Sequence, residues 1–297
     1  WVGAVIFIAL PIALTVFVWP HTAVEGTGAG TWFQWVKTYS CLAGAILGWL
    51  IVYFPAFQKK YIVCIPPIIF AINILEACIR DFQLTGVNGI VDGYMVVGGP
   101  WNVMNGIAGI LNAICICGFF GIIVSRGKKK DYVWPDQLWF WIIGYDLWNF
   151  AYTYNCLPTH SWFCGVALLL APTIAALIWN KGGWIMNRAN TLAIWCMFAQ
   201  IFPLFQETTA DGTTYYPWAT ISSQYADGTV NGIVAGTSNN ADPTAMTIVS
   251  ALALIVNAIA LGYIIYKSVK NKKNPYTNEV FTDFKYYKDA LARADVK

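Results

Sequence analysis

Long apolar runs separated by short polar connectors dominate the chain. A helix needs about 20 apolar residues to cross the hydrocarbon core of a membrane, and eight runs reach or approach that length. Several runs contain Pro or Gly, which membrane helices tolerate because neighbouring helices and water re-satisfy the freed carbonyls. The pattern predicts an all-α integral membrane protein, a polytopic bundle of about eight transmembrane helices. The predicted spans are 2–19, 39–57, 61–80, 101–125, 137–156, 161–180, 189–206 and 244–266.

The composition agrees with this fold class. Of the 297 residues, 58% are hydrophobic and 11% are charged, whereas roughly a quarter of the residues of a soluble domain are charged. The aromatic share of 16% suits a protein that is anchored at two membrane interfaces. Basic residues lie in short connectors between apolar runs, so we expect membrane lipids as partners and no nucleic acid.

The connectors alternate in charge along the chain. Sixteen of the eighteen Lys and Arg fall in one set of connectors and in the C-terminal segment, and only Lys37 and Arg80 fall in the other set. Cytoplasmic loops carry an excess of Lys and Arg. We therefore predict that the first set, which includes Lys181 and Arg188, lies in the cytoplasm together with both chain ends. The second set, which includes Asp81, is predicted outside.

This topology divides the chain into two parts. Residues 1–266 form the transmembrane helical bundle, with an extracytoplasmic loop at 206–243, and residues 267–297 form a basic cytoplasmic tail. The loop contains no Lys or Arg and is long enough to form a small ordered cap. Aromatic residues at helical spacing in the tail leave two alternatives, a short helix on the inner membrane surface or a solvated tail.

Polar groups inside a predicted span are costly in lipid and are therefore candidates for function. Asp146 lies near the middle of the fifth span, and it shares one helix face with Asn149 and Thr153. A carboxyl group at this depth must pair with another group, face a water-filled cavity, or stay protonated. Asp146 is therefore either a proton or cation site or a structural hydrogen-bond hub.

The fourth span supplies a second polar face. Asn102, Asn105 and Asn112 recur, with Gly109, at spacings of three and four residues, which places them on one side of a helix. Small residues let helices approach closely and amides bond across the interface. The stripe therefore either packs helices together or lines a solute pathway. Two single amides in later spans, Gln200 and Asn257, either join this cluster or brace helices.

A third polar group lies at the outer end of the third span. Asn73, Glu76 and Arg80 follow spacings of three and four residues and share one helix face. Glu76 and Arg80 are spaced for an ion pair between adjacent helical turns. The group is either an interfacial salt bridge that fixes helix depth or a charged gate at the external mouth.

Signatures of catalysis and of cofactor binding are absent from the sequence. There is no Walker, serine-hydrolase or zinc-protease motif. Both His lie at predicted outer ends, where they do not suit a haem inside the bundle. Cys156, His160 and Cys164 are spaced by fours, which leaves open a metal site, a disulfide or simple proximity. We expect no resident metal or cofactor, and nothing supports enzymatic activity.

Four strings resemble a prokaryotic multi-pass membrane-protein family that is catalogued only as a domain of unknown function. The strings are INILEACIRDFQ, GGPWNVMNGIAGILNA, WPDQLWFWIIGYDLWNFAYTYN and NRANTLAIW. The resemblance covers nearly the whole chain and implies the cytoplasmic membrane of a bacterium or archaeon. It also implies a further hydrophobic segment ahead of Trp1. It implies no activity, cofactor or catalytic residue.

The concentration of amides and carboxylates in the third to fifth spans favours one function. We expect a transporter or channel for a small solute or ion, with Asp146 as the central charge of a polar pathway. The first alternative is a non-catalytic subunit or receptor-like module, in which the stripes only join helices, protomers of a homo-oligomer or partners in a complex. A third is an intramembrane enzyme that acts on a lipid or quinone. A hydrated cavity near mid-membrane would favour transport, dry packing a subunit, and a lateral opening with titratable groups an enzyme.

Overall fold

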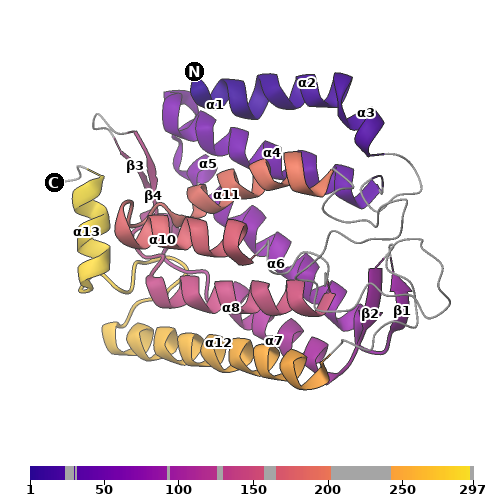
Figure 1. The fold of residues 1–297 in the computed structure, drawn as a ribbon. Helices are drawn as coiled ribbons and strands as arrows, with labels where there is room; N and C mark the ends of the chain where they lie inside the picture. The colour runs from indigo at the N-terminus through magenta and orange to yellow at the C-terminus, as the bar shows by residue number, and fades with distance from the viewer. Residues whose placement is uncertain are drawn as a thin grey trace.

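The computed structural model describes residues 1–23, 30, 32–91, 94–125, 130–156, 165–201 and 242–294. Its longer helices run side by side along one common direction (Figure 1). A helix occupies at least part of each of the eight predicted ranges. The described helices longer than ten residues are α4 (Trp32–Tyr53), α6 (Ile65–Leu84), α7 (Pro100–Ile114), α8 (Trp139–Cys156), α11 (Trp184–Trp195) and α12 (Pro243–Asn271).

Prolines explain why other helical stretches are interrupted. A proline lacks the backbone N–H, and its ring clashes with the carbonyl four residues earlier. A wider π turn accommodates this clash without ending the helix. Each π segment ends two or three residues before Pro11, Pro172 or Pro203. These segments are η1 (Val5–Ala9) between α1 (Val2–Ala4) and α2 (Leu10–Phe17), η4 (Gly165–Leu170) before α10 (Ala171–Ile178), and η5 (Cys196–Gln200) after α11.

Three described helical segments are long and apolar enough to cross a membrane: Gln34–Tyr53, Lys60–Leu84 and Pro243–Asn271. The middle segment joins α5 (Lys60–Val63) to α6, and the last is α12. Apolar side chains cover the outward face of α12, where Ile255 and Ile259 are 54% and 66% exposed. A contiguous apolar surface of this kind is unfavourable in water. The surface therefore fits lipid rather than solvent.

The predicted span 101–125 is not one continuous helix. Helix α7 ends at Ile114, and Gly118 adopts a left-handed conformation with φ of 64°. A Cβ atom at Gly118 would lie 2.4 Å from the Cβ atom of Asp136, so the chain turns here against a neighbouring segment. After η3 (Phe119–Gly121), strand β3 (Ile123–Val124) pairs in antiparallel fashion with β4 (Tyr132–Val133). The apolar run continues past the helix because this turn is itself buried.

Two short hairpins mark opposite ends of the bundle (Figure 1). Strands β1 (Asn88–Val91) and β2 (Tyr94–Val97) pair at one end. The β3–β4 hairpin and helix α13 (Lys285–Arg293) lie at the other end, which we call the tail end. Lys181, from a connector predicted to be cytoplasmic, pairs with Asp289 at the tail end, with Nζ 2.6 Å from the carboxylate oxygen. The described basic connectors therefore share one end of the bundle with the tail.

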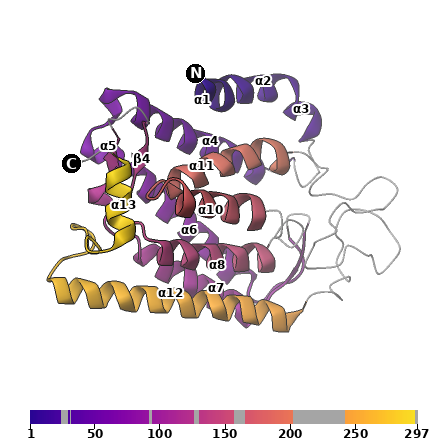
Figure 2. The same cartoon turned by 60° about the vertical axis from the view of Figure 1, so that its left-hand side comes forward.

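The C-terminal segment folds back onto the bundle. Asp136 accepts hydrogen bonds from the backbone N–H groups of Val280 and Phe281, at 2.9 and 3.0 Å. Tyr286 and Ala290 are buried, so one face of α13 packs against the protein. Figure 2 shows α13 lying across the tail end of the helices. A short helix is therefore present in the tail, and it packs on the connectors of its own chain.

Candidate functional site

A buried carboxylate, Asp81, joins three helices near the β1–β2 end. Its Oδ1 accepts from the side-chain amide of Asn102 at 3.1 Å, and its Oδ2 accepts from Asn105 at 2.7 Å. The Cys156 thiol on α8 donates to Oδ1 at 3.3 Å. Asp81, Asn102 and Asn105 are all 0% exposed. We call these four residues the Asp81 cluster, and they fasten α6, α7 and α8 together.

The sequence placed Asp81 in an outer connector, and that placement is wrong. Asp81 lies in the last turn of α6, which continues to Leu84. The predicted span ends at residue 80, one residue before Asp81. The helix can continue because Asp81 points to the amides of α7, whose hydrogen bonds replace the water that the carboxylate loses on burial.

A second polar contact joins α7, α8 and α12 further along the stripe. Asn112 donates to the side-chain oxygen of Asn257 at 2.7 Å, and Asn257 donates to the carbonyl oxygen of Gly144 at 2.9 Å. Both Asn side chains are 0% exposed. A Cβ atom at Gly109, between Asn105 and Asn112, would lie 2.4 Å from Cys78 Sγ. The described contacts of the α7 stripe are therefore contacts between tightly packed helices.

Asp146 lies in a different part of the bundle. Thr173 on α10 donates to its Oδ2 at 2.6 Å, and Trp184 on α11 donates to Thr173 Oγ1 at 2.9 Å. We call Asp146, Thr173 and Trp184 the Asp146 chain. The other carboxylate oxygen, Oδ1, is buried and makes no hydrogen bond among the described residues. Asp146 therefore links α8 to α10 and α11, and it does not meet the α7 stripe.

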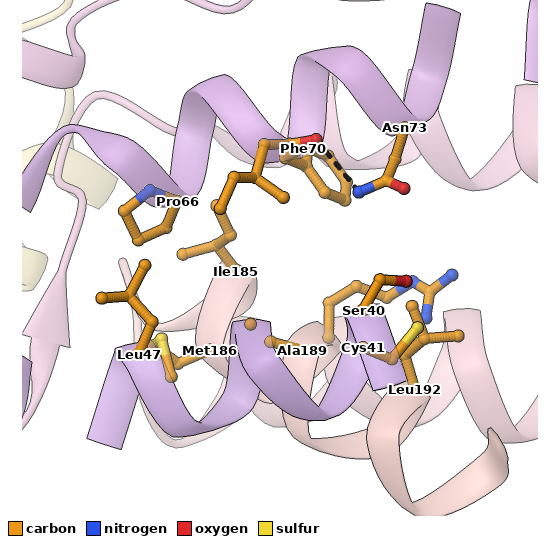
Figure 3. A pocket seen from close by; sticks show the side chains of 13 residues that line it. Ser40, Cys41, Leu47, Pro66, Phe70, Asn73, Ile185, Met186, Ala189 and Leu192 are labelled. Atoms are coloured by element: carbon orange, nitrogen blue, oxygen red, sulfur yellow. Dashed lines mark hydrogen bonds between the residues drawn. The ribbon is translucent and has the colours of Figure 1, made fainter. Parts of the chain in front are cut away.

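A cavity of about 70 Å³ opens between α4, α6 and α11. Figure 3 shows Asn73 on α6 facing Ser40 and Cys41 on α4 across it, with Leu47 and Pro66 at the other end. Arg188 also lines the cavity and is only 5% exposed. Its Nη2 lies 3.4 Å from the hydroxyl oxygen of Tyr145, the neighbour of Asp146 in the chain. The cavity thus has a polar end and an apolar end.

The other predicted site residues are dispersed. Asn73 is exposed beside the cavity and bonds to the Ile69 carbonyl of its own helix. Glu76 is exposed on α6, and Arg80 on the same helix is half-buried. Asn149 is half-buried, and its side chain makes no hydrogen bond within the described part of the chain. Gln200 ends η5, and its side chain lies outside the described residues.

Three residues of these sites were missed or misplaced by the sequence reasoning. Asp81 was assigned to an outer connector, and Thr173 was hidden in an apolar run. Arg188 was counted among the connector residues, but it lies inside α11, which begins at Trp184. The signal for the start of α11 was the Gly182-Gly183 pair, since Gly182 has φ of 80° and such a turn separates helices.

The described residues hold no metal cluster of His, Cys, Asp and Glu. Cys156 is a buried free thiol and is engaged with Asp81. His160 and Cys164 lie outside the described residues, as does most of the predicted loop 206–243. Within the described residues the thiol of Cys156 serves a helix contact, and the metal and disulfide alternatives involve residues outside that part of the chain.

The fold and these buried contacts define a helical-bundle protein with helices suited to crossing a membrane. The chain belongs to a family of unknown function, described as "Family of unknown function (DUF5692)", which matches residues 1–293. No curated protein matches the chain, and no solved structure matches it.

Proposed function

We propose that this protein is a multi-pass membrane transporter or channel for a small solute, with the cavity between α4, α6 and α11 as its solute site. One observation carries the proposal. The cavity brings a buried guanidinium, an amide and a hydroxyl, from Arg188, Asn73 and Ser40, together with an apolar wall. Ligand sites typically combine an apolar wall with a few placed polar groups.

The depth of the cavity supports this assignment. Asn73 lies eight residues after the start of α6, and Ser40 lies eight residues after the start of α4. At 1.5 Å per residue, each side chain is about 12 Å from one end of its helix. Transporters bind their solutes near the middle of the bilayer. Arg188 contacts Tyr145, and Asp146 is the next residue in the chain. Asp146, the proposed central charge, therefore lies beside the cavity but is not among the residues that line it.

We further propose eight membrane spans, with the tail in the cytoplasm of a bacterium or archaeon. The apolar exposed face of α12 and the gathering of Lys181 and Lys267 near the tail support this topology. Cysteines introduced at exposed Lys285 and exposed Gln83 test it with a membrane-impermeant thiol reagent on intact cells. Reaction at position 83 alone is expected, because these positions lie at opposite ends of the bundle. Reaction at both, or at position 285 alone, contradicts the orientation.

A flux experiment tests transport. Gly44 lines the cavity, and a Cβ atom there has no neighbour within 4 Å. Gly44→Leu is therefore expected to extend into the cavity, because its Cβ atom meets no neighbour. Gly262, exposed on α12, also has no neighbour within 4 Å, so Gly262→Leu is the matched control. Proteoliposomes are tested by osmotic swelling against glycerol, urea, alanine and acetate, and by conductance.

The expected result is flux of at least one probe that Gly44→Leu abolishes and Gly262→Leu preserves. Asp146→Asn is expected to change that flux, because Asp146 borders the site. Wild-type protein that matches protein-free liposomes for every probe contradicts transport. An unchanged rate in Gly44→Leu contradicts the assignment of the cavity.

One observation favours the second candidate, a structural subunit. The described hydrogen bonds of the Asp81 cluster, and the one from Asn112 to Asn257, join helices of this chain to one another. Such contacts cement a scaffold without conducting anything. A protein that co-purifies in a fixed ratio with another membrane protein and shows no flux alone supports this candidate.

A further inference from the structure

We infer that the cavity between α4, α6 and α11 binds a small monocarboxylate with a short hydrocarbon chain. This inference names the solute class of the proposed transport site and rests on that proposal. It is carried by the sign of the charge at the polar end, the apolar character of the other end, and the size of the space.

The charged side chain that lines the polar end is a cation. Arg188 is the charged residue among those that line the cavity, and no Asp or Glu is among them. Asp146 does not line the cavity, and its Oδ2 accepts from Thr173, but its carboxylate lies near enough to interact electrostatically with Arg188 from outside the cavity. A guanidinium matches the planar, bidentate geometry of a carboxylate, so an anion of this type fits the polar end.

The opposite end of the cavity is apolar. Leu47, Pro66 and Met186 lie there, away from Asn73 and Ser40 (Figure 3). Phe70 forms part of the same wall and packs edge-on to Trp184, with ring centroids 5.6 Å apart. Inorganic anions cannot use such a wall, because they gain nothing from apolar burial. The ligand therefore needs a hydrocarbon part attached to its anionic group.

The volume limits the length of that hydrocarbon part. A cavity needs at least about 10 to 15 Å³ to hold one water molecule, so about 70 Å³ admits a ligand of only a few heavy atoms. Butyrate has six heavy atoms, and butyramide is its uncharged analogue of the same size and shape. A longer acyl chain would have to leave through the open side of the cavity.

Binding is measured with the full chain in lipid nanodiscs, by saturation-transfer NMR of butyrate, butyramide, butylamine and inorganic phosphate. Saturable binding of butyrate, at least tenfold tighter than that of butyramide, is expected because a charged hydrogen-bonded pair is replaced by a neutral one. Arg188→Gln is expected to remove this preference, and Arg188→Lys to retain part of it. Gly44→Leu should abolish butyrate binding, and Gly262→Leu should leave it unchanged.

The variants keep the inference testable if the buried guanidinium is needed for folding, because Gly44→Leu leaves Arg188 in place. Equal binding of butyrate and butyramide, tighter binding of phosphate, or butyrate binding that survives Gly44→Leu overturns the inference. Flux of a neutral or cationic probe without butyrate binding also overturns it but leaves transport standing. Butyrate binding that requires Arg188, without any flux, supports the ligand class and removes the transport function.

Discussion

Asn105 donates its side-chain N–H to the carboxylate of Asp81 across 2.7 Å, with both side chains fully buried between α7 and α6. Burying a carboxylate is costly unless donors replace its water. Asn105 and Asn102 supply two of these donors, and Cys156 supplies the third. The polar stripe of α7 is therefore matched to a carboxylate that the sequence had placed outside the bundle.

Removing one of these donors should destabilise the protein. Asn105→Ala is expected to lower the free energy of unfolding by about 1.5 to 3 kcal/mol, because a buried carboxylate loses a charge-assisted hydrogen bond. The control is Gln83→Ala on the exposed side of α6, which should change it by less than about 0.5 kcal/mol. Unfolding in mixed detergent micelles measures both. Equal effects would mean that the Asp81 cluster contributes nothing to stability.

Alanine substitutions at two glycines, Gly144 and Gly262, distinguish the effect of helix propensity from the effect of packing on stability. A Cβ atom at Gly144 would lie 2.8 Å from the side-chain oxygen of Asn257, whereas one at Gly262 meets nothing within 4 Å. Gly144→Ala should therefore destabilise the protein by about 1 to 3 kcal/mol through overpacking. Gly262→Ala should stabilise it by about 0.5 to 1 kcal/mol, because Ala is the better helix former. The same unfolding assay compares the two variants. A stabilising effect of Gly144→Ala would show that the side chain of Asn257 does not limit how closely α8 and α12 pack.

Much of the fold could be predicted from the sequence because apolar runs determine where helices form. The periodicity of Asn102, Asn105 and Asn112 also predicted one polar helix face. The partners of that face could not be predicted, since they come from α6, α8 and α12, and one sequence does not say which helices are neighbours. Asn102 and Asn105 bond to Asp81, whereas Asn112 bonds to Asn257. This division of partners depends on how the helices pack together.

The candidate site was less accessible to sequence reasoning. Arg188 was read as a connector residue because counts of basic residues assume that Lys and Arg lie outside the helices. The structure places Arg188 within α11, against a cavity that α4 and α6 complete. A cavity is a gap between side chains of distant segments, so no local pattern reports it. Asp146 is half-buried, with one buried carboxylate oxygen, and its role stays a prediction.

The Asp146 chain makes a specific prediction about Thr173. Its hydroxyl donates to Asp146 and accepts from Trp184, and valine has the same shape without the hydroxyl. Thr173→Val should lower the free energy of unfolding by about 2 to 4 kcal/mol, because a carboxylate oxygen and an indole N–H each lose a partner. Thr173→Ser keeps the hydroxyl and should retain most of that stability. Chemical unfolding followed by Trp fluorescence distinguishes them, and equal losses would mean that only the methyl group matters.

Docking of the C-terminal segment should depend on pH through Asp136. Burial raises the pKa of Asp136 to about 6, although the N–H groups of Val280 and Phe281 oppose this shift. The docked state therefore binds a proton more tightly than the released state, whose carboxyl has a pKa near 4. Docking should strengthen as pH falls from 7 to 5, by about 1.3 kcal/mol, because this range extends about one pH unit below the docked pKa and each unit is worth 1.36 kcal/mol.

Below pH 4 the direction should reverse. Lys267 and Lys181 lower the pKa values of Asp283 and Asp289, so these carboxylates protonate only there and then lose their ion pairs. Hydrogen exchange at the Phe281 amide, compared between wild type and Asp136→Asn, isolates the contribution of Asp136. The wild type should gain protection relative to the variant between pH 7 and 5. Parallel pH profiles for the two proteins would show that Asp136 does not control docking of the tail.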